Sequence, residues 1–246
     1  MLNNMLVKKA FRIIRRNYGC PGLDGVSIKD IKQNYNYYIN KIIDLYNSYT
    51  FGRYPVKTTT ITDYNNKPRD IFIYCLYDRW IQQILKLQIE EIIENDLKEY
   101  VFGYRRKLNI GMLRKYTKSF NSKYILNIDI LGFYNHINRD HLNKVLIKNT
   151  SISKEFLTRI DLSFSHLSNG LPQGNVLSPI LSNYYLAGID SMFNSKYARF
   201  SDDMFFAIND LEEQNDIINK LVPELGKLSL SINFEKVRLF ETNSFK

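Results

Sequence analysis

The sequence predicts an α+β fold, with helices packed on an antiparallel sheet. Two apolar, aromatic-rich runs have strand character: residues 124–128, which lead into Asp129, and residues 197–206, which contain the adjacent acids Asp202 and Asp203. Apolar residues at helical spacing occupy the segments between and after these runs. The resulting order, strand, helix, helix, hairpin, helix, strand, is typical of a helical layer on an antiparallel sheet.

The first half of the chain is expected to contain helices and one hairpin. After a turn-rich segment at residues 19–27, residues 28–49 carry isoleucine and leucine at helix-compatible spacing. The run VKTTTITDYNNKPRDIFIY predicts a β-hairpin whose turn is Tyr64-Asn65-Asn66-Lys67. Asp78 has the chemistry of an N-cap, and it predicts the start of a long helix that ends near residue 95.

The second half is expected to form the sheet and its helices. Its predicted elements are a strand at 124–128, helices at 139–148 and 179–192, the hairpin at 197–206, a helix at 211–226 and a strand at 230–234. The chain has no Gly/Ser/Pro-rich linker, so the boundary expected near residue 120 rests on this change of pattern alone.

Composition indicates a cytoplasmic globular protein with a polyanionic partner. The chain has 246 residues, 44% of them hydrophobic, a formal net charge of +9 and a pI near 9.3. No apolar run is long enough to span a membrane, and the N-terminal segment has Lys and Arg among its apolar residues, unlike a secretory signal. The two cysteines, Cys20 and Cys75, can form neither a disulfide framework nor a four-cysteine zinc site.

One stretch is strongly basic. Residues 101–128 contain seven basic residues and no acid, with Tyr104, Tyr116 and Phe120 interleaved among them. Basic residues that neutralise phosphates, next to aromatic rings that stack on bases, are typical of nucleic-acid-binding proteins. A solvated basic face explains this stretch equally well by itself. The residues expected to bind nucleic acid are Arg105, Arg106, Lys107, Arg114 and Lys115.

The two adjacent acids allow two interpretations. Ser201-Asp202-Asp203 is good turn chemistry, and a hairpin with its tip there would leave both carboxylates in water. Metal binding is the alternative, and it needs a third carboxylate, which Asp129 supplies if its strand lies beside the hairpin. Three crowded carboxylates repel one another, and Mg²⁺ relieves that repulsion while leaving room for phosphates. The sequence therefore predicts a metal and phosphate site at one edge of the sheet.

Several motifs of the chain resemble those of reverse transcriptases. NIDILGFYNHI is similar to the family's first catalytic motif, and GLPQGNVLSPILSNYYLAGID to its Pro-Gln-Gly motif with the helix that follows. YARFSDDMFFA resembles the Tyr-x-Asp-Asp motif, and LSLSINFEKVRLF the lysine-bearing motif. Upstream, PGLDGVS, the Lys67-Pro68-Arg69 region, YDRWIQQILKLQI and VFGYRR occur in the order of bacterial group II intron-like enzymes. The resemblance covers about residues 19–240.

The resemblance implies a right-hand polymerase with fingers at residues 1–120 and a palm at residues 121–246, whose antiparallel sheet is backed by helices. Its catalytic residues would be Asp129, Asp202, Asp203 and Lys236, the lysine being the proton donor to the pyrophosphate leaving group. Asp129, its neighbour Ile130, Asp202 and Asp203 would form the site for two Mg²⁺ ions, with Mn²⁺ as a possible substitute.

The resemblance also implies a binding site for dNTPs. Its residues would be Lys67, Arg69, Tyr134, Gln173 and Phe200. Arg69 and Lys67 match triphosphate-binding cations, Gln173 matches a glutamine along the incoming nucleotide, and the ring of Tyr134 would exclude a 2′-hydroxyl. Without the motifs, Tyr134 would be interpreted as a core aromatic. Phe200 stands where the family usually has tyrosine, so an altered contact with the primer is expected.

The leading hypothesis is an RNA-directed DNA polymerase that uses an RNA template and a DNA or RNA primer. The chain stops at Lys246, just past the lysine-bearing motif, so no thumb is expected in it, and a partner protein could supply one. One alternative is a non-catalytic RNA-binding or assembly module. Another is template-independent or protein-primed DNA synthesis, as in defence against phage.

Overall fold

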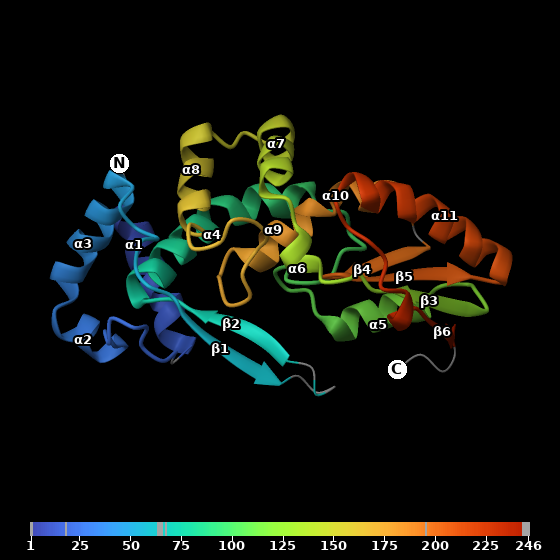
Figure 1. Cartoon of the computed structure of the whole chain (residues 1–246), viewed down its shortest axis with the longest axis horizontal. Coiled ribbons are helices and arrows are strands. Elements are labelled where there is room, and N and C mark those ends of the chain that lie inside the picture. Colours follow the sequence, from blue (N-terminus) through green and yellow to red (C-terminus); the bar gives the residue numbers. More distant parts are fainter. Residues whose placement is uncertain (1, 18, 63–65, 67, 195, 243–246) are drawn as a thin grey trace. The chain divides into compact units, whose positions relative to one another are not determined.

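A computed structural model describes residues 2–17, 19–62, 66, 68–194 and 196–242. The elements form two compact units that alternate along the chain (Figure 1): Met1–Ile92 with Asn143–Ser178, and Ile93–Leu142 with Pro179–Lys246. These units are defined by compactness, so the division into fingers and palm near residue 120 stays a prediction. In the part of the chain that the structure describes, no helix is long and apolar enough to cross a membrane.

The first unit combines helices with a two-stranded hairpin. Its elements are α1 (Asn4–Ile14), α2 (Ile28–Gln33), α3 (Tyr35–Ser48), β1 (Lys57–Thr62), β2 (Pro68–Ile73), α8 (Lys154–Leu162) and most of α4 (Leu76–Asp96) and α7 (Arg139–Asn149). Asn3 caps α1 through the backbone N–H of Met5, and the helix buries one apolar face. Trp80 of α4 packs on Phe11 of that face, with the ring centroids 4.6 Å apart.

Two expectations for this unit were wrong in detail. The helix expected over residues 28–49 is divided at Asn34, whose ψ of 44° is not helical. Asp78 is not an N-cap, because α4 begins at Leu76 and Asp78 is buried inside it. Its carboxylate instead accepts a hydrogen bond from the backbone N–H of Gly52 at 2.8 Å. The hairpin is confirmed, whereas its predicted turn at Tyr64-Asn65-Asn66-Lys67 lies, except for Asn66, outside the described residues.

The second unit is built on an antiparallel sheet. Its strands are ordered β4 (Tyr197–Phe200), β5 (Asp203–Ile208), β3 (Tyr124–Ile128) and β6 (Arg238–Glu241). Its helices are α5 (Ile110–Lys118), α6 (Phe133–His136), α10 (Ala187–Asp190), α11 (Leu211–Lys227) and nearly all of α9 (Ser178–Tyr185). Figure 1 shows α5 and α11 on opposite sides of this sheet.

Alternation along the strands gives the sheet two apolar faces. Ile125, Ala198 and Phe205 belong to a cluster that includes Leu113 of α5, so they define the face that α5 covers. The residues that alternate with them, including Tyr197, Phe206 and Met204, are buried on the opposite face. Because both faces are covered, most residues of β3, β4 and β5 are buried and the others are half-buried, whereas the edge strand β6 is exposed.

Two predicted elements of this unit differ from the structure. The helix expected at 179–192 is divided at Leu186, whose ψ is 0°, into α9 and α10. The strand expected at 230–234 is wrong: only Ile232 forms an isolated bridge, to Ile130, and the chain then makes a 3₁₀ turn at Phe234–Lys236 before β6. The alternation of LSINF suits a strand, but this segment pairs for only a few residues around Asp129.

Candidate active site

Asp129 lies directly after β3 and is held by the backbone of a segment far along the chain. The backbone N–H of Asn233 donates to the carbonyl of Asp129 at 2.9 Å, and that of Leu131 donates to the carbonyl of Ser231 at 2.9 Å. These two bonds on either side of Ile130 fix the position from which the Asp129 carboxylate extends. Its side chain is 10% exposed, so nearly all its interactions are with protein.

The Asp129 carboxylate has two protein partners. Lys236 Nζ lies 2.8 Å from Oδ2, and Asn233 Nδ2 donates to Oδ1 at 3.0 Å. Lys236 lies in the 3₁₀ turn and Asn233 directly precedes it. In an extended strand, two residues three positions apart would point to opposite faces, so the turn is what lets both side chains reach Asp129. Asn233 was not expected in the site. Its only signal in the sequence is its position three residues before Lys236.

Asp202 and Asp203 lie at the tip of the β4–β5 hairpin, as their turn chemistry predicts. Ser201 adopts a left-handed conformation with φ of 59°, and Asp203 is the first residue of β5. The last aligned pair between β3 and β5 is Ile128 with Met204, so the next step of this register places Asp129 beside Asp203. Opposed side chains in an antiparallel pair lie on the same face. The three acids therefore converge at one end of the sheet.

Burial and mutual charge make this end of the sheet electrostatically negative. Burial, followed by the charge of Asp202, raises the pKa of Asp203 from its usual 3.8 to about 6. Burial also raises the pKa of Asp202. The hydrogen bond to Asp129 raises the pKa of Lys236, which keeps its amine protonated. Asn127 Nδ2 approaches Asp203 Oδ1 at 3.4 Å, but an amide adds no positive charge.

The donor chemistry suits a divalent cation. Three carboxylates face the ammonium group of Lys236. Burial is the main cause of the raised pKa values of Asp202 and Asp203, and the charges of neighbouring carboxylates add to it. A bound divalent cation would relieve this repulsion. In the described ranges, no three His, Cys, Asp or Glu side chains are close enough to hold one ion together. The side chain of Ile130 is buried and offers no donor, so only its backbone carbonyl could bind a cation.

Tyr134 and Phe200, the two expected substrate-binding aromatics of this unit, are both half-buried. Tyr134 lies on α6, where its hydroxyl accepts a hydrogen bond from Ser182 Oγ at 3.3 Å, and burial raises its pKa. Phe200 packs against the cluster under α5, and its ring centroid is 6.2 Å from that of Tyr104. The turn of the hairpin is therefore flanked by aromatic rings on the same face as Asp203.

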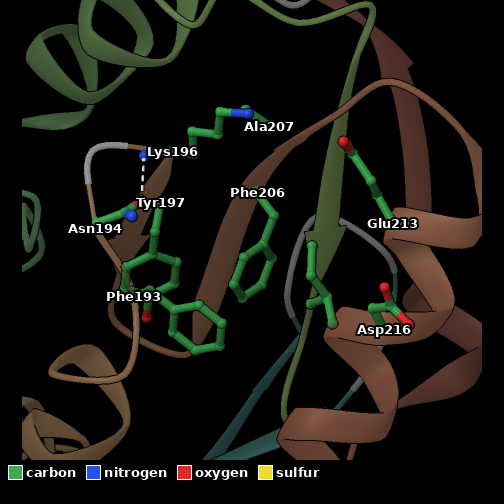
Figure 2. Close-up of a pocket in the computed structure, with 9 residues that line it drawn as sticks. Phe193, Asn194, Lys196, Tyr197, Phe206, Ala207, Glu213 and Asp216 are labelled. Atoms are coloured by element: carbon green, nitrogen blue, oxygen red, sulfur yellow. Dashed lines mark hydrogen bonds between the residues drawn. The ribbon is translucent and has the colours of Figure 1, made fainter.

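A buried polar network on the opposite face of β4 was not predicted. Arg199 and Asp190 are both 0% exposed and form an ion pair with Arg199 Nη2 2.6 Å from Asp190 Oδ2. Beside them, the rings of Phe193, Tyr197 and Phe206 form a cluster along a cavity of about 230 Å³ (Figure 2). Arg199 lies three residues before Asp202 in sequence, but it is on the face of the sheet opposite Asp203 because neighbouring strand residues alternate faces.

The basic stretch has two kinds of residue. Arg105 is half-buried, and its Nε lies 2.9 Å from Glu94 Oε1, so its charge is neutralised by an acid of the same unit. Arg114 and Lys115 are exposed on α5, where charges can contact a polyanion. Phe120 was wrong as a stacking residue, because it is 8% exposed and belongs to the cluster under α5. Arg106 and Lys107 are exposed near the start of α5.

The remaining candidate residues belong to the first unit. Gln173 is half-buried, and its backbone carbonyl accepts a hydrogen bond from the N–H of Phe72 in β2 at 2.8 Å. The next residue, Gly174, has φ of 108°, and a side chain there would collide with the backbone of Phe72, so this close approach requires glycine. Arg69 is exposed on β2, and Lys67 lies outside the described residues.

Comparison with known proteins agrees with the geometry. A family model described as reverse transcriptase (RNA-dependent DNA polymerase) matches residues 57–246. Protein YkfC of Escherichia coli (strain K12) is 24% identical over 194 residues, which are 72% of this chain and 51% of YkfC. The group II intron-encoded protein LtrA of Lactococcus lactis subsp. cremoris is 27% identical over 166 residues, 62% of this chain and 27% of LtrA. The chain spans about half the length of these relatives, or less.

Solved structures with the same fold include two telomerases. Telomerase from Candida albicans, in complex with a fragment of telomeric RNA, has a TM-score of 0.56 and 14% identity over 89% of this chain and 48% of its own. Apo telomerase from Candida tropicalis has a TM-score of 0.53 and 14% identity over 85% of this chain and 49% of its own. At such identities the likeness concerns the fold alone. It confirms the predicted α+β fold of fingers and palm.

Proposed function

We propose, from the premise that this chain belongs to the reverse transcriptase family, that it is an RNA-directed DNA polymerase. It would add dNTPs to the 3′-hydroxyl of a DNA or RNA primer on an RNA template. The observation that carries this proposal is the convergence of Asp129, Asp202 and Asp203 at one end of the sheet, with Lys236 paired to the first of them.

The three carboxylates would hold divalent cations, as members of this family generally require, and Mg²⁺ is the proposed ion with Mn²⁺ as a substitute. Bound ions would supply Lewis-acid activation of the attacking oxygen and of the leaving oxygen in the displacement at phosphorus. Asp129 follows the end of β3, Asp203 begins β5, and Asp202 lies in the turn between β4 and β5. The proposed ligands therefore come from the end of β3 and from the β4–β5 hairpin. Oxygen donors of this kind suit Mg²⁺.

The chain's own residues contribute proton transfer and selection. Lys236 keeps a proton on Nζ because its hydrogen bond to Asp129 raises its pKa, and it is the proposed donor to the departing pyrophosphate. Tyr134 is the proposed barrier to a 2′-hydroxyl, and its half-buried ring is held in place through Ser182. The sequence motifs assign Gln173 and Arg69 to the incoming nucleotide.

The partners follow from the same chemistry. A chain of net charge +9 with exposed Arg114 and Lys115 suits an RNA template and its primer. LtrA is a group II intron-encoded protein, and this chain matches part of it, which supports a place in the group II intron-like branch. The cytoplasm is the proposed location.

Primer extension tests the proposal. Wild-type protein, a primed RNA template, dNTPs and Mg²⁺ should give extended DNA, and the variant with both Asp202→Asn and Asp203→Asn should give none. The alternative, a non-catalytic RNA-binding module, predicts RNA binding that is insensitive to Mg²⁺ and to both substitutions. Equal incorporation by wild type and the double variant would exclude the proposed site. Incorporation without any template would instead support template-independent synthesis.

A further inference from the structure

Arg199 has all of its guanidinium N–H groups engaged although it is completely buried. Nε and Nη2 bind the two oxygens of the Asp190 carboxylate at 2.7 and 2.6 Å. Nη1 donates to the side-chain oxygen of Asn183 at 3.0 Å and to the backbone carbonyl of Ser201 at 2.7 Å, and Nη2 also donates to the carbonyl of Asn183 at 3.1 Å. The planar fork of arginine suits this geometry, whereas lysine has no such fork.

The network reaches the hairpin turn that carries the acids. Ser201, whose carbonyl Arg199 binds, is the residue directly before Asp202. Asp190 ends α10 and Asn183 lies in α9, so the guanidinium ties the turn to two helices behind the sheet. Tyr197 of the aromatic cluster in Figure 2 donates from its hydroxyl to Asp190 Oδ1 at 2.8 Å, which fixes the acid as well.

The outer edge of β4 is fixed by a second set of contacts. The backbone N–H of Arg199 donates to the carbonyl of Tyr100 at 2.9 Å, and that of Phe102 donates to the carbonyl of Arg199 at 2.8 Å. Gly103 follows, with its Cα so close to the backbone of Ser201 that a side chain would collide with it. The side-chain amide of Asn183 donates to the carbonyl of Gly103, so this asparagine connects the guanidinium of Arg199 with the segment 100–103 that borders β4.

Ser201 needs such support because of its backbone conformation. Its φ of 59° lies in the left-handed region, which is unfavourable for residues other than glycine unless the surroundings hold them there. The Ser201 carbonyl is oriented by Arg199, and its amide lies against Gly103. The direction in which Asp202 leaves the turn depends on this residue.

We infer that Arg199, held by Asp190 and Asn183, is a positioning residue that fixes the turn from which Asp202 extends. A buried ion pair contributes little to stability by comparison with apolar residues of the same volume, so its presence behind this turn points to a role in conformation. Arg199 is completely buried, and its guanidinium is bound to Asp190, Asn183 and Ser201. It acts through the backbone of Ser201, and its link to metal binding rests on the function proposed above.

The first experiment measures the turn itself, without any metal. Amide hydrogen exchange of residues 200–203 is compared with that of β3 in wild type, in Arg199→Lys, and in Leu225→Ala, a buried position of α11 that serves as the control. Arg199→Lys should raise exchange in the turn by about tenfold relative to β3. Leu225→Ala should change both segments together. Asn183→Ala, which keeps the ion pair, should act in the same direction as Arg199→Lys with a smaller effect.

The second experiment measures Mn²⁺ binding by electron paramagnetic resonance in EDTA-stripped protein. Arg199→Lys should weaken binding by about tenfold, and Leu225→Ala should leave it unchanged, since pre-organised ligands bind more tightly than mobile ones. If turn exchange in both Arg199→Lys and Asn183→Ala matches that of Leu225→Ala, the positioning role is wrong. If wild type binds no Mn²⁺, the proposed metal site fails, while the exchange result still decides the role of Arg199.

Discussion

Lys236 and Asp129 are 107 residues apart in sequence, and Lys236 Nζ lies 2.8 Å from Asp129 Oδ2. This contact joins the lysine-bearing segment to the end of the central strand β3. It places the ammonium group of Lys236 on a carboxylate that the proposed cations would also need. In the proposed site, the lysine would compete with the cation for Asp129 and would be the proton donor in turnover.

Replacing Lys236 by Gln should affect cation binding and turnover in opposite directions. Loss of the ammonium group frees Asp129, so the Mg²⁺ concentration at half-maximal rate should fall several-fold. Loss of the proton donor should lower the maximal incorporation rate by roughly 10²-fold. Steady-state primer extension over a Mg²⁺ series measures both. Lys227→Gln, at an exposed lysine of α11, is the control and should change neither. A rate equal to wild type would remove Lys236 from proton transfer.

Asp203 should make the metal-free protein less stable as pH rises. Its pKa of about 6 in the folded state exceeds the ordinary 3.8, so folding retains a proton that the unfolded chain releases. The free energy of unfolding should therefore fall by roughly 1–3 kcal/mol between about pH 4 and pH 6, and remain lower above that range.

Thermal unfolding in EDTA at a series of pH values measures how the stability depends on pH. Asp203→Asn should flatten this dependence and raise Tm at pH 7.5 by a few degrees, on the order of 3–6 °C. Added Mg²⁺ should raise Tm of wild type more than that of the variant. Asp216→Asn, at an exposed acid of α11, should retain the wild-type slope. An unchanged slope in Asp203→Asn would mean that another group carries it.

Tyr134 should control discrimination against ribonucleotides. Tyr134→Ala removes the ring, whereas Ser182→Ala keeps the ring and removes the hydrogen bonds of the serine to the Tyr134 hydroxyl and to the carbonyl of Pro179. The first should raise ribonucleotide incorporation relative to dNTP incorporation by about tenfold or more, and the second by much less, because steric exclusion requires the ring. Single-nucleotide incorporation with matched dNTP and rNTP pairs measures the ratio. An unchanged ratio in Tyr134→Ala would make Tyr134 a packing residue.

The basic stretch should separate into binding and structural residues. Arg114→Gln with Lys115→Gln should weaken RNA binding and lower the slope of log affinity against log salt by about 1 per lost phosphate contact, with Tm unchanged. Arg105→Gln breaks the pair with Glu94 and should cost roughly 1–3 kcal/mol of stability, with the salt slope unchanged. RNA titrations at several salt concentrations, together with thermal unfolding, distinguish them. If Arg105→Gln lowered the salt slope and the double variant lowered Tm, Arg105 would be the binding residue and Arg114 and Lys115 the structural ones.

Much of this fold could be predicted from local sequence. The hairpins, the strand at 124–128 and the helix expected at 211–226 were identified because their apolar periodicity and turn residues agree with the final structure. The strand predicted around Ile232 was wrong although the segment alternates like a strand. Its backbone instead forms hydrogen bonds with residues on either side of Ile130, including Asp129. The prediction of Asp78 as an N-cap was wrong because its carboxylate accepts a hydrogen bond from a distant partner, the backbone N–H of Gly52. Such long-range partners leave no local signal.

The site shows the same limit. Asp129, Asp202 and Asp203 were predicted together because burying an unpaired carboxylate in apolar surroundings is costly, and the family motifs assign all three to one metal site. Asn233 and the pair of Arg199 with Asp190 were missed, because their role depends on which face of a strand or turn each residue occupies. The burial of Phe120 likewise could not be derived from charge patterning.

The most direct measurement is the rate of single dNTP addition to a primed RNA template by wild type, Asp129→Asn and Asp216→Asn. Asp129→Asn preserves the volume of the side chain and removes the charge that both Lys236 and the proposed cations require. We expect addition by wild type and Asp216→Asn at similar rates, and a loss of at least about 10³-fold in Asp129→Asn. Addition by Asp129→Asn at the wild-type rate would contradict the assignment of this sheet edge as the polymerase centre.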